Sequence, residues 1–178
     1  IFISNGYLRD YTNKDFLRYW GDYKIKKAIA AEPFLLMDLV KAMPSTLLPN
    51  YIFRNNHDLT FTNKQAEWGL SQATISSGAV YADLDNDGDL DLIVNNINQP
   101  ASVYQNMSRE NSSSNYIAIK LKGTGKNTNA IGAKIYVYTP GNMQYQEVNP
   151  NRGYLSCVST TLNFGLGSNN TIDSLRII

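Results

Sequence analysis

The spacing of apolar residues first predicts helices. Between residues 13 and 43, apolar side chains recur at intervals of three and four, a spacing typical of helices packed on one face. Pro33 interrupts the pattern and Pro44 ends it. Thr12, followed three residues later by Asp15, has the spacing of a capping box. We therefore expect two helices over about residues 13–43, the first capped by Thr12.

From Asn50 the apolar residues alternate with polar ones, which is typical of strands. The segment "YIFRNNHDLTFTN" predicts a hairpin whose turn contains Asn55–Asp58. Two apolar strands, in "SGAVYADL" and "LDLIVNN", flank an acidic loop, and "ASVYQN" predicts a third. The small polar residues of "MSRENSSS", which ends at residue 114, indicate a linker.

The segment after Asn115 is also predicted to be β-structure. In "NYIAIKLKG", Ile117, Ile119 and Leu121 alternate and should share one face of a strand. Two further strands are joined by a turn at Pro140–Asn142, and "TTLNFGLG" and "IDSLRII" predict two more. We expect a small β-sandwich-like domain of about five strands.

Two short motifs recur along the chain. "IFISNG" at residues 1–6 matches "LIVNNI" at residues 92–97, and "YIFRN" resembles "SVYQN". Such recurrence favours a repeat array such as a β-propeller, with the helical pair inserted between two repeat units. Because the second copy directly follows the acidic loop, we also expect the chain to be a fragment with a similar loop upstream of residue 1.

These patterns predict a mainly β fold made of partial β-propeller blades with a helical insertion, followed by the sandwich-like domain. A complete propeller of about four to eight blades would not fit in 178 residues. The expected division is residues 1–49 for the end of a repeat plus the insertion, 50–107 for a repeat with the acidic loop, 108–114 for the linker, and 115–178 for a truncated β-domain.

Composition narrows the functional classes. Hydrophobic residues make up 43% and charged residues 17%, as in a globular protein, and the net charge is +1. The near-zero charge argues against nucleic acid as a partner, and no apolar run is long enough for a membrane span. Cys157 is the single cysteine, so no internal disulfide can form, and we expect it in the core.

The acidic loop, within "VYADLDNDGDLDLIV", carries the strongest chemical signal. Aspartates occupy every second position, and Gly88 stands at position six of the loop, where a sharp turn is needed. Alternating carboxylates with this glycine suit Ca²⁺, which takes six to eight oxygen ligands. In the helical calcium loop, position twelve is a Glu that binds the ion with both oxygens. Here this position is Val94, and the segments on both sides of the loop have the pattern of strands, so the loop differs from the helical type. The expected ligands are the side chains of Asp83, Asp85 and Asp87, the main-chain carbonyl of Asp89, and Asp91.

Two alternatives for this loop remain open. It could be a solvated acidic turn that holds no metal. A strand followed by Asp-x-Asp also begins phosphotransferases of the haloacid-dehalogenase type, in which Asp83 would be the nucleophile and Asp85 the acid or base. The β-pattern after Asp91 disfavours that interpretation. His57, the only histidine, lies in a predicted turn and suggests no catalytic group.

The residues also resemble a known family. "GAVYADLDNDGDLDLIVNN" resembles the FG-GAP/VCBS repeat of integrin-like β-propellers, whose blades carry calcium sites between strands. "NAIGAKIYVY", "RGYLS", "NFGLG" and "IDSLRII" resemble the ASPIC/UnbV domain, and the N-terminal segment is similar to that of Bacteroidetes members.

The resemblance implies an exported bacterial protein, located at the cell surface, outside the cell or in the periplasm. We expect a non-enzymatic calcium-binding module with an adhesion, ligand-binding or scaffolding role and no catalytic residues. Its partner would be a protein or a glycan. A carbohydrate-binding accessory domain of a glycan-utilisation system is the alternative function.

Overall fold

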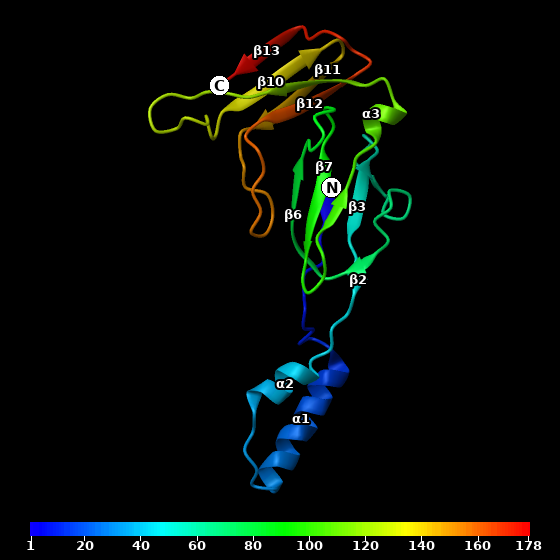
Figure 1. Ribbon diagram of the computed structural model, residues 1–178, viewed down its shortest axis with the longest axis vertical. Coiled ribbons are helices and arrows are strands. Elements are labelled where there is room, and N and C mark those ends of the chain that lie inside the picture. Colours follow the sequence, from blue (N-terminus) through cyan, green and yellow to red (C-terminus); the bar gives the residue numbers. More distant parts are fainter. The chain divides into compact units, whose positions relative to one another are not determined.

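The computed structural model describes residues 1–178 and contains thirteen strands and three helices (Figure 1). The predicted mainly β fold is confirmed. The chain divides into two compact units, one of residues 1–77 and 96–100 and the other of residues 78–95 and 101–178. The elements are β1 (Phe2–Ile3), α1 (Lys14–Ile29), α2 (Leu36–Ala42), β2 (Leu48–Pro49), β3 (Tyr51–Asn55), β4 (Phe61–Asn63), β5 (Ala73–Thr74), β6 (Ser76–Ala82), β7 (Asp91–Asn96), β8 (Ser102–Tyr104), α3 (Ser108–Asn111), β9 (Asn115–Ile119), β10 (Lys134–Thr139), β11 (Asn142–Glu147), β12 (Leu162–Gly167) and β13 (Ser174–Ile177).

The two predicted helices form, but the predicted cap of the first is wrong. Asn13 caps α1, and its side-chain oxygen accepts a hydrogen bond from the Phe16 N–H at 3.0 Å. Thr12 instead donates from its N–H and its hydroxyl to the Asp10 carboxylate, at 2.9 and 2.7 Å. Asparagine caps helices as well as serine or threonine do, so Asn13 can take the position that the sequence analysis assigned to Thr12.

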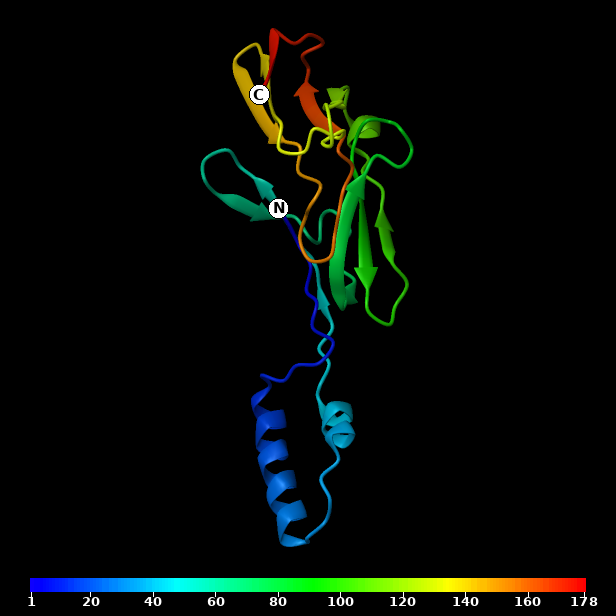
Figure 2. The same ribbon diagram turned by 90° about the vertical axis from the view of Figure 1, so that its left-hand side faces the viewer.

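Helices α1 and α2 lie side by side (Figures 1 and 2). Aromatic contacts join this pair to the loop between the helices, and the Lys27–Glu32 ion pair also joins α1 to that loop. The Trp20 ring meets the edge of Phe34 with centroids 4.7 Å apart, and Tyr23 lies 6.1 Å from the same ring. Phe16 and Leu39 are the buried members of the two helices, one from each.

The sequence repeat corresponds to a repeated hairpin. In the first copy, β1 pairs antiparallel with β3, with Phe2 opposite Ile52 and Ile3 opposite Tyr51. In the second copy, β7 pairs with β8 in the sheet β6-β7-β8, and Ile93 and Val94 lie opposite Val103 and Ser102. These four pairs occupy matching positions of the two sequence motifs.

The two hairpins therefore pair their strands in the same register. They differ in the segment that connects the two strands. A short turn that contains Asn98, with a φ of 56°, joins β7 to β8. The connection from β1 to β3 is much longer and contains both helices. The helical pair thus lies inside a hairpin of the repeat unit.

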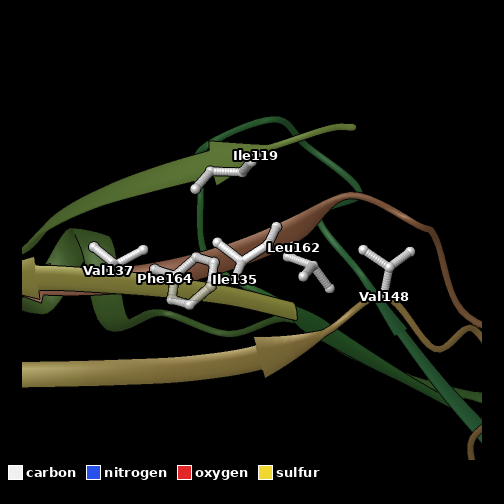
Figure 3. Packing of buried hydrophobic residues seen from close by; sticks show 6 residues of the cluster. All are labelled: Ile119, Ile135, Val137, Val148, Leu162 and Phe164. Atoms are coloured by element: carbon white, nitrogen blue, oxygen red, sulfur yellow. The ribbon is translucent and has the colours of Figure 1, made fainter. Parts of the chain in front are cut away.

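The C-terminal strands form two small sheets around a shared core. One sheet has the order β11-β10-β13, and β12 pairs with β9 in the other. Ile117 and Leu121 pack against this core as predicted, because they share the strand face of buried Ile119. Figure 3 shows the buried cluster, to which both sheets contribute: Ile119, Ile135, Val137, Val148, Leu162 and Phe164.

Candidate metal centre

The acidic loop joins β6 to β7, as the sequence predicted, and its backbone turns sharply. Asn86 and Gly88 both have positive φ, of 62° and 96°. Tyr116 on β9 also covers Gly88 closely, because a Cβ added at this glycine would lie 1.9 Å from the tyrosine Cε1. Glycine at position six is thus required by the backbone conformation and by the neighbouring ring.

This turn gathers three of the predicted ligands. Carboxylate oxygens of Asp83, Asp85 and Asp87 all lie within 4.8 Å of one another. At Ca–O distances of about 2.3–2.6 Å, oxygens with this spacing can contact a single ion. Val94, at the twelfth position, is fully buried and offers no oxygen ligand from its side chain. Asp83, Asp85 and Asp87 therefore form the centre of the candidate site.

Several oxygens of this cluster are buried without a hydrogen-bond donor. They are Asp83 Oδ1, Asp87 Oδ2 and Asp89 Oδ1. The second oxygen of each carboxylate does accept a backbone N–H, from Gly88 at 3.1 Å, Asp89 at 3.0 Å and Arg109 at 3.0 Å, respectively. A buried carboxylate oxygen without a donor is destabilising, and a bound cation would satisfy it. The donor set consists of hard oxygen ligands and fits calcium.

No basic side chain neutralises the loop. The two ion pairs of the structure, Lys27–Glu32 and Lys64–Glu67, lie elsewhere in the chain. The Arg109 guanidinium donates instead to the Ser114 carbonyl and lies 5.3 Å from the Tyr116 ring centroid.

The burial of the loop and the negative charges within it raise the pKa of the Asp89 carboxyl. Burial raises its pKa, and the charges of Asp87, Glu110 and Asp91 raise it further, while the hydrogen bond from the Arg109 N–H acts in the opposite direction. Each of these upward effects disfavours the charged carboxylate. A divalent cation at this position would favour the charged form instead.

Asp91 has a different environment from the other aspartates. It is 2% exposed, and its two oxygens accept the N–H groups of Leu84 at 3.0 Å and Asn106 at 2.8 Å. Its carboxylate therefore ties the start of the loop to Asn106, the second residue after β8. It belongs to neither group of acidic side chains whose oxygens lie within 4.8 Å, so its role as a ligand stays a prediction.

The structure adds residues that the sequence did not indicate. Asp87 and Asp89 form a second group with Glu110, again with oxygens within 4.8 Å of one another. Gln105 donates from Nε2 to Asp85 Oδ2 at 2.9 Å. The only sequence signal near Gln105 is the resemblance of "SVYQN", which ends at Asn106, to "YIFRN".

The remaining single candidates lie outside the acidic loop. His57 lies in the turn between β3 and β4 with a φ of 64°, and its N–H donates to Asn55 Oδ1. The expectation that Cys157 lies in the core is wrong, because the side chain is exposed. Its neighbour Ser156 is the buried residue of this segment.

Two family models match separate parts of the chain. Residues 36–94 match the FG-GAP-like repeat, and this range contains the whole acidic loop. Residues 123–178 match ASPIC and UnbV, and this range contains β10 to β13. No curated protein matches the chain. FG-GAP-like repeats often bind Ca²⁺ and are typical of extracellular or surface proteins. None of the helices has both the length and the apolar character needed to cross a membrane.

Proposed function

The chain is an FG-GAP-like repeat protein with an ASPIC and UnbV domain, and we propose that it is a non-enzymatic calcium-binding module of an exported bacterial protein. Its role would be adhesion, ligand binding or scaffolding outside the cytoplasm. The calcium would be structural, because it would hold together the loop between two strands of the repeat.

The observation that carries this proposal is the set of buried carboxylate oxygens without donors at Asp83, Asp87 and Asp89. Asp83, Asp85 and Asp87 would hold the ion, which supplies the positive charge that the surrounding side chains lack. With this charge balanced, the carboxylates no longer repel one another across the turn. Strands β6 and β7 would then be fixed relative to each other at the loop.

The test is a thermal unfolding series with calcium and with EDTA. EDTA should lower the melting temperature and calcium should restore it, since a ligand that binds only the folded chain stabilises it. Asp87→Ala should remove most of this difference. Asp58→Ala is the control, because Asp58 lies at the β3–β4 turn and bonds to Thr60. An equal melting temperature with and without calcium in the natural protein would refute the proposal.

A catalytic role for the loop is tested separately. A phosphotransferase of the type considered above would show phosphatase activity with magnesium that disappears in Asp83→Asn. We expect no such activity. Magnesium-dependent phosphatase activity that Asp83→Asn abolishes would overturn the non-enzymatic part of the proposal.

One observation favours the carbohydrate-binding alternative. A cavity of about 340 Å³ lies in the first unit beside the segment that precedes α1. Its lining includes Tyr7, Arg9, Asp10 and Tyr11. Both tyrosines are exposed, at 77% and 61%. Exposed aromatic rings beside charged groups can offer a sugar an apolar face together with hydrogen-bonding groups. Glycan-array binding that Tyr7→Ala and Tyr11→Ala weaken would support this function, and an array without binding would count against it.

A further inference from the structure

Glu110 lies beside the calcium loop although it is nineteen residues beyond Asp91 in the chain. It belongs to α3, Ser108–Asn111, the helical turn that follows β8. Its carboxylate lies within 4.8 Å of oxygens from both Asp87 and Asp89. Three carboxylates from two separate segments therefore meet at one place.

Hydrogen bonds between the loop and the segment after β8 hold this arrangement. The Asn106 N–H donates to Asp91, and its side-chain amide donates to the Leu90 carbonyl at 3.3 Å. The Asn106 side-chain oxygen also accepts the N–H of Ser108 at 3.1 Å. The Arg109 N–H then donates to Asp89 Oδ2. The backbone that leads into Glu110 is thus held to the loop, which makes the approach of its carboxylate a consequence of the fold.

The charges at this place are not balanced. None of the three carboxylates has a basic partner within ion-pair distance, and the Arg109 side chain is directed to Ser114 and Tyr116. Asp87 Oδ2 and Asp89 Oδ1 are also buried without a donor. Three like charges that the fold holds together without a cation repel one another. The arrangement is therefore the one expected of oxygen ligands around a divalent cation.

We propose that Glu110 is an additional calcium ligand, supplied from outside the loop, so that ion binding also fixes α3 in place. This inference rests on the proposed function, because it assumes that the loop binds calcium. Its consequence is that calcium orders the segment between β8 and β9, which begins at Asn115. The stretch that the sequence indicated as a linker would then be part of the metal site.

The first test is terbium binding, with calcium as the competitor. Tb³⁺ prefers oxygen ligands, and the Tyr116 ring over Gly88 is placed to sensitise its luminescence. Glu110→Gln should weaken terbium and calcium binding by about tenfold or more, because calcium affinity follows the number of charged ligands. Glu67→Gln is the matched control, since Glu67 pairs with Lys64 at 62% side-chain exposure outside the loop. It should bind as the natural protein does.

Ionic strength separates a ligand from a remote charge. In about 1 M KCl the Debye length falls to about 3 Å, so the effect of a distant charge is largely screened. The loss caused by Glu110→Gln should persist there. Its disappearance in high salt, or binding within about twofold of the natural protein in either condition, would overturn the assignment of Glu110. Failure of the natural protein to bind either ion would instead refute the proposed function, and the inference with it.

Hydrogen exchange gives a second readout that does not depend on affinity. Calcium should slow exchange of the Arg109 and Asn111 amides, which donate to Asp89 and to the Met107 carbonyl. The slowing should occur in the natural protein and in Glu67→Gln, and it should be lost in Glu110→Gln at saturating calcium. Equal slowing in all three proteins would show that the ion does not act on α3 through Glu110.

Discussion

Gly88→Ala tests whether the shape of the acidic loop is set by its glycine. The backbone φ of 96° lies where a side chain is strained, at a cost of about 1–3 kcal/mol. The new methyl group would also lie 1.9 Å from Tyr116 Cε1, and overpacking of this kind costs about 1–3 kcal/mol. Reduced freedom of the unfolded chain offsets about 0.4–1 kcal/mol. The free energy of unfolding should therefore fall by roughly 1–6 kcal/mol.

The assay is urea unfolding in the presence of EDTA, so that metal binding does not contribute. Gly141→Ala is the control, because Gly141 lies in the same compact unit with a φ of 75° and no atom within 4 Å of an added Cβ. This variant should show the strain of a side chain at positive φ without a steric contact, and it should cost about 1 kcal/mol. Combining Gly88→Ala with Tyr116→Ala should recover part of the loss, with a coupling of about 1–3 kcal/mol. Equal costs at the two glycines, together with no coupling to Tyr116, would refute this account of the loop.

Two further predictions concern the core and the β3–β4 turn. Phe164→Ala should lower the free energy of unfolding by about 3–5 kcal/mol, because Phe164 is fully buried, whereas Phe61→Ala at 49% exposure should have a much smaller effect in the same urea assay. The Asp58 carboxyl should titrate below its ordinary value, because the Thr60 hydroxyl and N–H lower its pKa, and Thr60→Val should raise the midpoint measured by NMR. The stabilisation from this bond is present above pH 3.8 and is lost as the pH falls through the lowered pKa.

Local patterns were sufficient to predict most of the secondary structure. Alternation placed Ile117, Ile119 and Leu121 on one face because strand side chains point in opposite directions in turn, and the core confirms this. The turn at Gly141 was predictable because glycine adopts the positive φ that the turn requires. The break between the two helices was predictable because proline, here Pro33, does not fit inside a helix. The cap of α1 was wrong by one residue, because Thr12 and Asn13 are both capable of capping and only the fold decides between them.

The candidate site was predictable only where its residues are close in sequence. Asp83, Asp85 and Asp87 meet because a single tight turn contains them. The contributions of Gln105, Asn106 and Glu110 depend on the pairing of β7 with β8, which returns the chain to the loop after a separation of many residues. The prediction that Cys157 is buried was wrong because its segment forms no regular strand or helix. Buried and exposed residues there do not alternate in a way that the sequence could predict.

Calcium titration by isothermal calorimetry tests the central claim most directly. The natural protein should show saturable binding, with an affinity no weaker than the 10⁻⁴–10⁻³ M that is typical of extracellular modules. A variant with Asp83, Asp85 and Asp87 all changed to Asn should show none, because the three grouped carboxylates are then absent. The same saturable binding in both proteins, or no saturable binding in the natural protein up to about 10 mM calcium, well above that range, would contradict the assignment of the loop as a calcium site.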